Sequence, residues 1–262
     1  MSAKLRRGQI AKLLHEQPVS VEELAVRFGV SLSTIRRDLE TMAGAGQVVR
    51  TYGGARTIGR GERSLLERES IATRQKAAIG RLAVSYVLPG SVNILDAGTT
   101  AGALAARLVD HEGITVVTNG LTATGLLEHS EGVTLVVLGG TLRHVSSGMV
   151  GPLAEQAMNN ITADAAFLGT DGLVAGRGLS EGTAEQASLK RMMVDNAREV
   201  YVLADSTKLG LDTSHWWTPL ERPWHLITDT DATPEQLEPF RRLGQVEILL
   251  ARTAPVPVEG VG

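Results

Sequence analysis

The feature that most constrains this chain is a series of short apolar runs in residues 89–262, separated by helix-forming stretches. Most of the runs are apolar throughout, without the alternation of a half-buried strand. Strands of this kind belong to a parallel sheet that helices cover. The predicted fold class is therefore α/β, with an open, mainly parallel sheet. The seven predicted strands are 92–95, 114–117, 133–138, 165–168, 200–204, 226–227 and 246–250.

Polar and glycine-rich residues follow most of the predicted strands. In an open α/β sheet the carboxyl ends of the strands form the crevice in which ligands bind. Six such loops at one edge predict a single small, polar, oxygen-rich ligand, and the alternative is that each loop is an ordinary turn. The loops read DAGTT (96–100), TNG (118–120), GGT (139–141), GTDG (169–172), ADSTKLG (204–210) and TD (228–229).

The first loop narrows the chemistry of the ligand. Its residues Gly98–Thr100 precede a helix expected to start near Ala101, where backbone N–H groups, two hydroxyls and the helix dipole favour an anion such as phosphate. Neither G-x-x-x-x-G-K-[ST] nor G-x-G-x-x-G occurs, so a nucleoside triphosphate or a dinucleotide is poorly supported and no cofactor is expected. The loop residues expected to contact the ligand are Asp96, Gly98, Thr99, Thr100, Asn119, Asp171, Asp205 and Lys208.

The first 60 residues carry a different charge from the rest of the chain. They hold 10 Lys and Arg against 5 Asp and Glu, a net charge of +5, whereas the remaining residues carry −8 and the whole chain −3. A basic head on an acidic body indicates that the head meets a polyanion and the body does not. The alternative is a small, surface-rich domain that is basic by chance.

The basic head shows the pattern of a helix-turn-helix. A first apolar stripe ends before Pro18, which cannot continue a helix. The segment Ser20–Glu23 then matches the S-x-x-E capping box, so a second helix is expected over 21–28, with a break at Gly29. Ser31 is a natural N-cap for a third helix. Two helices joined by a turn that contains glycine form a helix-turn-helix.

The third helix is expected to have one apolar and one polar face. At about 100° per residue, one arc gathers Leu32, Ile35, Leu39 and Met42. Arg37 lies at the centre of the opposite face, where it suits bidentate contact with guanine, and Arg36 lies at the edge, where it suits phosphate. The alternative is that both arginines pair with Asp38, Glu40 or Glu23.

A wing is expected after the third helix. Residues 47–52 predict a strand and Gly53-Gly54 a tight turn. Its side chains would contact the DNA backbone or the minor groove, or would only cover the small core. The predicted partner is a double-stranded DNA operator, and the predicted contact residues are Ser31, Ser33, Thr34, Arg36, Arg37, Thr41, Arg50, Tyr52 and Arg56.

Two groups of motifs resemble the DeoR family of bacterial transcription regulators. In the head, VSLSTIRRDLETMAGAGQVVRTYGGA resembles the family's N-terminal winged helix-turn-helix. The rest of the chain resembles the family's effector-binding domain through ILDAGTTAGALA, VVTNGL, LGGTLR, AFLGTDGL, GLSEGTAEQASLKRMM and VYVLADSTKLG. Together the motifs extend the resemblance over Arg6–Leu250, nearly the whole chain.

The resemblance implies a function as well as a fold. The family's sensor domain is similar in fold to ribose-phosphate isomerases, glucosamine-phosphate deaminases and coenzyme A transferases, which implies a phosphorylated sugar or related metabolite as effector. The chain is therefore expected to be a repressor of genes for sugar or related carbon metabolism, relieved by its effector. The family's ligand residues carry over to Asp96, Gly98, Thr99, Thr100, Thr118, Asn119, Asp171 and Lys208.

An enzyme is the alternative function. Asp171 or Glu181 could act as general base in a sugar-phosphate isomerase or deaminase that carries an appended DNA-binding head. The head favours the regulator, because a catalyst gains little from a wing and an arginine-bearing helix. We therefore expect a protein that is not an enzyme.

The expected organisation has three parts: a winged helix-turn-helix at 1–57, a linker and connecting helix at 58–88, and an effector-binding domain at 89–262. One winged head makes few base contacts, so a homodimer or homotetramer on two half-sites is expected. The chain has no cysteine, no run long enough to span a membrane, and six histidines without paired ligand spacing. We therefore expect a cytoplasmic protein without a metal site. The loop with His215, Trp216 and Trp217 either shapes ligand choice or packs over the sheet edge.

Overall fold

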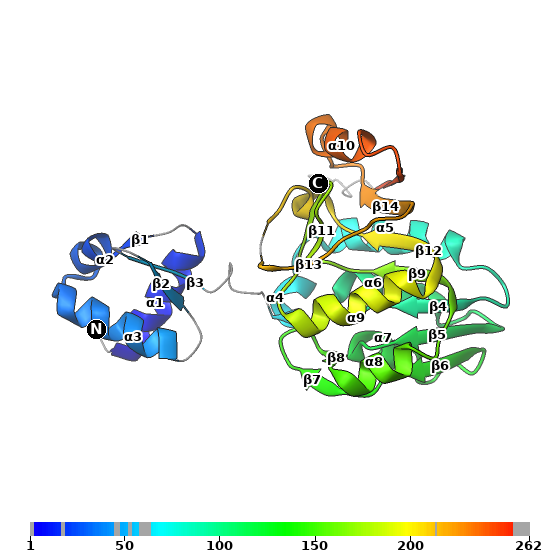
Figure 1. Cartoon of the computed structure of the whole chain (residues 1–262), viewed down its shortest axis with the longest axis horizontal. Coiled ribbons are helices and arrows are strands. Elements are labelled where there is room, and N and C mark those ends of the chain that lie inside the picture. The colour runs from blue at the N-terminus through cyan, green and yellow to red at the C-terminus, as the bar shows by residue number, and fades with distance from the viewer. Residues whose placement is uncertain are drawn as a thin grey trace, which may run out of the picture. The chain divides into compact units, whose positions relative to one another are not determined.

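The computed structural model describes residues 3–16, 19–44, 48–51, 54–57, 64–212 and 214–253 (Figure 1). By its internal contacts the chain divides into two compact units, Met1–Glu62 and Arg63–Gly262. Each unit has a hydrophobic core of its own.

The described residues of the first unit form three helices and a small sheet. Ser20 caps the second helix as predicted: its hydroxyl accepts the N–H of Glu23 at 3.1 Å, and the Glu23 carboxylate accepts the N–H of Ser20 at 3.0 Å. Gly29 ends this helix with a φ of 60°, a left-handed conformation that glycine adopts without strain. The helices are α1 (Ala3–Glu16), α2 (Val21–Phe28) and α3 (Leu32–Gly44), and their buried core is Ile10, Val21, Leu24, Ala25, Ile35, Leu39 and Met42.

The predicted wing is an antiparallel hairpin of β2 (Val48–Thr51) and β3 (Gly54–Thr57). Gly54 was predicted to lie in the turn, but it is the first residue of β3 and pairs with Thr51. A third strand, β1 (Val19–Ser20), adds to the other edge of β3. The sequence did not predict β1, because two residues carry no periodicity.

The second unit is built on a seven-stranded parallel sheet in the order β15-β14-β12-β9-β4-β5-β6. Each of the seven predicted strands lies in this sheet, so the prediction of a parallel α/β sheet is confirmed. The strands are β4 (Val92–Leu95), β5 (Ile114–Thr118), β6 (Val133–Val137), β9 (Ala163–Leu168), β12 (Ala197–Leu203), β14 (Trp224–Asp229) and β15 (Val246–Ala251).

Helices cover both faces of the parallel sheet (Figure 1). Successive residues of a strand point to opposite faces, so Ile94 and Leu95 of β4 belong to different cores. Helices α5, α6 and α7 contribute to the core around Leu95, and α8, α9 and α10 to the core around Ile94. The bounds are α5 (Thr73–Ala83), α6 (Thr99–Leu108), α7 (Leu121–Leu127), α8 (Pro152–Met158), α9 (Ala184–Asp195) and α10 (Pro234–Arg241).

The segment predicted to be a connecting helix packs within the second unit where it is described. It forms α4 (Leu65–Glu69), then α5, then the short 3-10 helix η1 (Val84–Tyr86). Ala72, with a φ of 51°, separates α4 from α5. Ile79 of α5 is fully buried in the core around Leu95, so α5 helps to cover the sheet.

Two small antiparallel sheets accompany the parallel sheet, and the sequence predicted neither. In one, β7 (Thr141–Arg143) pairs with β8 (Gly148–Val150). In the other, β11 (Gly178–Glu181) pairs with β10 (Gly172–Val174) on one side and with β13 (Trp216–Thr218) on the other.

The order of the parallel sheet reverses between β4 and β9. The chain runs outward from β4 through β5 to β6, then returns to the other side of β4 at β9 and continues to β15. In open α/β sheets, ligands bind outside the carboxyl ends of the strands at such a switch point. A ligand site is therefore expected at the loops that follow β4 and β9.

Candidate functional site

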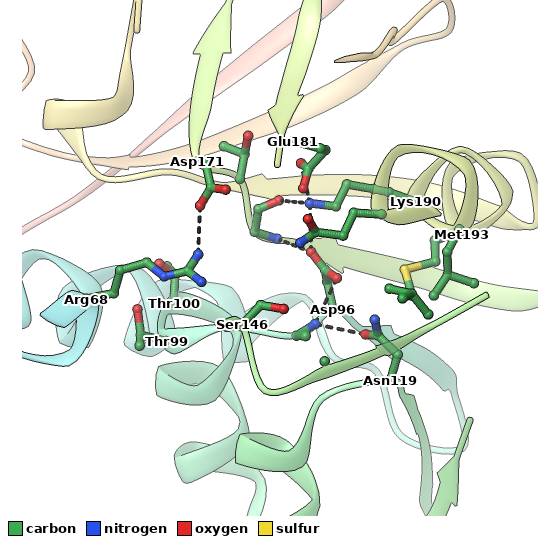
Figure 2. A pocket seen from close by; sticks show the side chains of 18 of the residues that line it. Arg68, Asp96, Thr99, Thr100, Asn119, Ser146, Asp171, Glu181, Lys190 and Met193 are labelled. Atoms are coloured by element: carbon green, nitrogen blue, oxygen red, sulfur yellow. Dashed lines mark hydrogen bonds and ion pairs between the residues drawn. The ribbon is translucent and has the colours of Figure 1, made fainter. Parts of the chain in front are cut away.

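A pocket lies at the switch point between β4 and β9 (Figure 2). Its wall combines the loops after β4, β5 and β9 with residues of α4, α9, the β7–β8 hairpin and β11. Leu189 and Met193 of α9 supply part of its apolar surface. The polar and charged side chains in the wall are Arg68, Asp96, Thr99, Thr100, Asn119, Ser146, Thr170, Asp171, Glu181, Gln186, Lys190 and Lys208.

Asp96 and Asn119 hold the loops of the pocket together. Asp96 Oδ1 accepts the N–H of Ala97 at 2.8 Å, and Asp96 Oδ2 accepts the N–H of Gly169 at 3.2 Å, which joins the ends of β4 and β9. Asn119 Oδ1 accepts the same Ala97 N–H at 2.9 Å, and its Nδ2 donates to the Met149 carbonyl at 3.1 Å. Both side chains line the pocket, but much of their hydrogen-bonding potential is satisfied by backbone groups of the protein.

A buried cation, Lys190, forms part of the pocket wall. Its Nζ lies 3.0 Å from Asp96 Oδ2 and donates to Glu181 Oε1 at 2.5 Å and to the Gly169 carbonyl at 2.7 Å. Burial alone lowers the pKa of Lys190, but the carboxylates of Asp96 and Glu181 outweigh burial and raise it. Burial raises the pKa of Glu181 to about 8, against the attraction of Lys190. Burial therefore favours the protonated form of Glu181 at neutral pH, with the ammonium group of Lys190 in contact with both Glu181 and Asp96.

A second ion pair lies on the side of the pocket away from Lys190 (Figure 2). Arg68 Nη1 is 2.7 Å from Asp171 Oδ1, and the two side chains are 16% and 14% exposed. Lys208 also lines the pocket, with its Nζ 3.9 Å from Asp205 Oδ2. Burial lowers the pKa of Lys208, and Arg68 adds to this effect. This part of the pocket thus combines two cationic side chains with one carboxylate.

The N-terminus of α6 faces the pocket and is suited to an anion. Gly98 precedes the helix with a φ of 129°, no described side chain caps it, and its first turn has no acidic residue. The first N–H groups of a helix lack partners within the helix and attract negative charge. Among the described residues, the buried atoms Thr100 Oγ1, Ser146 Oγ and Gln186 Oε1 of the pocket wall have no hydrogen-bond partner. Such atoms are costly, so they indicate a polar ligand.

Seven of the nine predicted ligand residues line the pocket, namely Asp96, Gly98, Thr99, Thr100, Asn119, Asp171 and Lys208. Thr118 does not, because it is fully buried and its hydroxyl accepts the N–H of Gly120 at 3.0 Å. Asp205 does not either, because its Oδ1 accepts the N–H of Thr207 at 3.2 Å and the hydroxyl of the same residue at 2.5 Å. In this structure, therefore, neither Thr118 nor Asp205 is part of the pocket wall.

Five polar residues of the pocket wall were not predicted: Arg68, Ser146, Thr170, Gln186 and Lys190. Arg68 and Ser146 come from segments that only tertiary packing brings to the site, so no local pattern could place them. The α9 residues did carry a signal. Gln186, Lys190 and Met193 fall on one helical face. A lysine on a face that is otherwise buried is expected to bind a carboxylate.

Both candidate general bases are already bound to cationic side chains of the protein. Glu181 Oε1 accepts a hydrogen bond from Lys190, and Asp171 Oδ1 binds Arg68. A general base must reach the proton that it abstracts from a substrate. The geometry therefore gives no support to the isomerase or deaminase alternative.

The third helix of the head presents the predicted polar face. Arg36 and Arg37 are exposed, whereas Ile35 and Leu39 on the opposite face are buried. Leu32 departs from the prediction, since it is 40% exposed at the first position of α3. The apolar arc therefore begins one turn later than the sequence predicted.

In the described part of the head, Asp38 binds the first helix instead of the arginines of α3. Arg6 Nε lies 2.6 Å from Asp38 Oδ2, and Arg7 Nη1 lies 3.4 Å from Asp38 Oδ1. Asp38 is buried, so these contacts fasten α3 to α1 inside the unit. The carboxylate of Glu23, another proposed partner, caps α2 at Ser20. The two arginines of α3 thus remain on the surface.

The predicted hydroxyl contacts of α3 have local roles as well. Ser31 Oγ accepts the N–H of Thr34 at 3.2 Å, as expected for an N-cap, and lies 2.8 Å from Ser33 Oγ. The Thr41 hydroxyl donates to the Arg37 carbonyl at 2.9 Å. Ser33 and Thr41 are exposed beside the arginines, and Thr34 is half-buried. These hydroxyls support the helix that carries Arg37.

The wing residues predicted to contact DNA belong to the hairpin. Arg50 lies in β2 opposite Ala55 of β3, and Arg56 lies in β3 opposite Val49 of β2. The prediction for Tyr52 lies outside the described residues.

The aromatic loop packs beside the pocket without lining it. None of the described side chains of the pocket wall is His215, Trp216 or Trp217. The Arg177 guanidinium stacks 3.8 Å from the centroid of the Trp217 ring and also lies 2.7 Å from Asp212. Trp216 and Trp217 form part of β13 at the edge of the small sheet, which favours the packing alternative.

No group of three or more His, Asp or Glu side chains in the described ranges is placed to hold a metal ion. His225 has two carboxylate neighbours, Glu199 at 3.0 Å and Glu247 at 2.9 Å, and it stacks on Tyr201. Within the part of the chain that the structure describes, the helices are too short or too polar to cross a membrane.

A basic head whose third helix exposes two arginines, and a polar pocket in the other unit, define a class of protein: a DNA-binding transcription regulator that senses a small molecule. Residues 6–60 match the DeoR-like helix-turn-helix domain, and residues 71–230 match the DeoR C terminal sensor domain. The chain belongs to the DeoR family of transcription regulators, which bind DNA through the helix-turn-helix and sense effectors through the C-terminal domain. The family consists of regulators and not of enzymes, so the enzyme alternative is not supported.

Relatives match the chain over most of its length. A protein of Escherichia coli O157:H7 that is named as an aga operon transcriptional repressor is 35% identical over 94% of this chain and 93% of that protein. The glycerol-3-phosphate regulon repressor of Escherichia coli K12 is 31% identical over 80% and 84%. Ribose 5-phosphate isomerase A from Methanocaldococcus jannaschii has a TM-score of 0.40 and 22% identity over 52% of this chain and 54% of the isomerase. The structural similarity to this isomerase is too low to say anything about activity.

Proposed function

We propose that this protein represses genes for sugar or related carbon metabolism, and that a phosphorylated sugar in the second unit changes its affinity for operator DNA. The composition of the pocket supports this proposal. The N-terminus of α6 and the cationic side chains of Arg68 and Lys208 line the same pocket, and together they favour a phosphate group. The unpartnered atoms of Thr100, Ser146 and Gln186 suit the hydroxyl groups of a sugar. A relative named for the glycerol-3-phosphate regulon supports a small phosphorylated metabolite as effector.

The operator binds the first unit. Helix α3 enters the major groove, where Arg37 contacts a guanine edge and Arg36 a phosphate. The wing, with Arg50, Tyr52 and Arg56, reaches the DNA backbone or the minor groove beside α3. The exposure of both α3 arginines and the net charge of +5 over the first 60 residues support this arrangement.

The protein acts as a homodimer or homotetramer in the cytoplasm, where the operator is. One head contacts few base pairs, so paired heads on two half-sites are needed for useful specificity. We assign the head to residues 1–57, the linker and connecting helix to 58–88, and the effector-binding domain to 89–262. Repression is relieved when the effector binds.

The effector can be identified by thermal unfolding of the full chain with a panel of phosphorylated sugars, each beside its unphosphorylated form. A ligand present at 100 times its Kd adds about 2.7 kcal/mol to the stability of the folded state. We expect stabilisation by a phosphorylated member of the panel and none by its unphosphorylated form. Turnover of any member at enzymatic rates, or the absence of stabilisation across the panel, would count against the proposal.

Thr99→Val tests the assignment of the anion site. Thr99 lines the pocket at the first position of α6, so losing its hydroxyl should abolish the stabilisation and leave DNA binding intact. Thr134→Val is the matched control, because Thr134 is exposed on β6, outside the pocket wall. A normal response to the effector in Thr99→Val would remove the assignment.

A further inference from the structure

Helix α4 is attached to the second unit through polar contacts. None of its residues is buried. The N–H of Leu65 donates to the Val145 carbonyl at 2.9 Å, and Arg68 Nη2 donates to the same carbonyl at 3.3 Å. Lys76 Nζ of α5 donates to the Arg68 carbonyl at 2.5 Å. Helix α4 is the first described helix after the head in the chain.

The side chain of Arg68 runs from α4 into the pocket, where Asp171 binds it. The distance of 2.7 Å and the exposed fractions of 16% and 14% describe a largely desolvated ion pair. Figure 2 shows the guanidinium of Arg68 pointing toward Asp171, with Thr99 and Thr100 of α6 beside it. The pair therefore lies next to the helix N-terminus that suits an anion. The buried, unpartnered hydroxyls of Thr100 and Ser146 point independently to a ligand there.

A phosphate at the start of α6 would compete with Asp171 for Arg68. Two neighbouring anions repel each other, and the planar guanidinium fork binds a phosphate in a bidentate manner. We propose that Asp171 binds Arg68 in the absence of the effector. When the effector binds, its phosphate replaces Asp171 as the partner of Arg68, and this exchange shifts α4. This proposal rests on the proposed function, since it requires a phosphorylated ligand in the pocket.

The exchange of partners gives the protein two conformations that the effector binds with different affinities. A ligand changes the affinity for DNA only if it binds two conformations with different affinities. In one conformation Arg68 binds Asp171, and in the other Arg68 binds the phosphate. Since Arg68 and Leu65 share the Val145 carbonyl, a movement of Arg68 alters the attachment of α4.

Inorganic phosphate is the probe for this exchange, used with the full-length protein and its variants Asp171→Asn and Arg68→Gln. Phosphate affinity is measured by calorimetry, and the state of α4 by amide hydrogen exchange over residues 64–72. Asp212→Asn is the matched control, because Asp212 also lies 2.7 Å from an arginine, Arg177, but in an exposed pair outside the pocket wall.

Asp171→Asn should bind phosphate more tightly than the wild type, because the competing carboxylate is gone. It should also show, without phosphate, the exchange pattern of residues 64–72 that phosphate induces in the wild type. Arg68→Gln should bind phosphate about tenfold more weakly or worse, as expected for the loss of a charge-assisted contact. Asp212→Asn should behave as the wild type in both measurements.

Two failures are distinguishable. If phosphate does not protect the amides of residues 96–101 in the wild type, the proposed function itself fails. If phosphate protects those amides but Asp171→Asn binds it no more tightly than Asp212→Asn, or residues 64–72 do not respond, the exchange of partners is overturned. Should Arg68→Gln fail to fold, Asp171→Asn still decides the matter.

Discussion

Lys190 is the residue on which the charge balance of the pocket depends. Its ammonium group lies 3.0 Å from Asp96 Oδ2 and 2.5 Å from Glu181 Oε1, and all three side chains are buried. Lys190→Met should destabilise the fold by about 3–5 kcal/mol, because it leaves an uncompensated buried charge. Glu181→Gln should cost about 1 kcal/mol or less near neutral pH, because the amide oxygen still accepts a bond from Lys190. Urea unfolding measures both variants, and equal losses would contradict this account.

Because the pKa of Glu181 is raised, the contribution of Glu181 to the stability of the fold depends on pH. The ordinary pKa of the carboxyl is 4.5 and its pKa in the fold is about 8. Between these values the folded state holds a proton that the unfolded chain has lost, so the stability that Glu181 contributes falls as the pH rises. Glu181→Gln cannot release this proton.

The unfolding free energy of Glu181→Gln, relative to the wild type, should therefore rise between pH 4.5 and about pH 8. Urea titrations at several pH values across this window provide the measurement. A difference that stays constant with pH would show that Glu181 is ionised in the folded protein.

At the residue scale, the sequence located the side chains that follow strands better than those that come from elsewhere. Asp96, Thr99 and Asp171 each follow a recognisable strand and lie at the pocket. Thr118 follows the predicted strand 114–117, but in the structure it is the last residue of β5 and is fully buried, which only the folded backbone determines. Arg68 lies in a segment interpreted as a connector, so its arrival at the pocket depends on how α4 packs.

At the scale of elements, helix α3 carries the clearest prediction for DNA binding. Arg37→Ala should weaken operator binding by about 1–3 kcal/mol and relax the preference for one base. Arg36→Ala, as a phosphate contact, should weaken binding to all sequences alike and reduce its dependence on salt. Titrating each variant with a duplex selected by the wild type, and with its single-base variants, separates the two roles. An unchanged base preference in Arg37→Ala would contradict the assignment.

The elements that the sequence predicted are those with a strong local pattern. The seven parallel strands are apolar runs, and α2 has a capping box at Ser20 and a glycine stop at Gly29. The five strands of the two small sheets are three or four residues long, and three of them mix apolar and polar residues, so no periodicity marks them. The break between α4 and α5 falls at Ala72, where neither glycine nor proline signals it.

At the scale of the whole molecule, the uneven charge separates two tasks. The first 60 residues carry +5 and the rest −8, so DNA is attracted to the head and repelled by the sensor. This charge pattern was readable from the sequence. The assembly of the heads was not, because the contacts between copies of a chain depend on surfaces that a sequence pattern does not define.

The most direct test of ligand-controlled DNA binding is the affinity of the full chain for a selected duplex, with and without the phosphorylated sugar that stabilises it. Fluorescence anisotropy at fixed salt gives both dissociation constants. We expect weaker binding with the phosphorylated sugar, by the roughly 5- to 150-fold of typical allosteric coupling, and no change with the unphosphorylated form. Equal affinities with and without the phosphorylated sugar, in a protein that demonstrably binds it, would contradict the account.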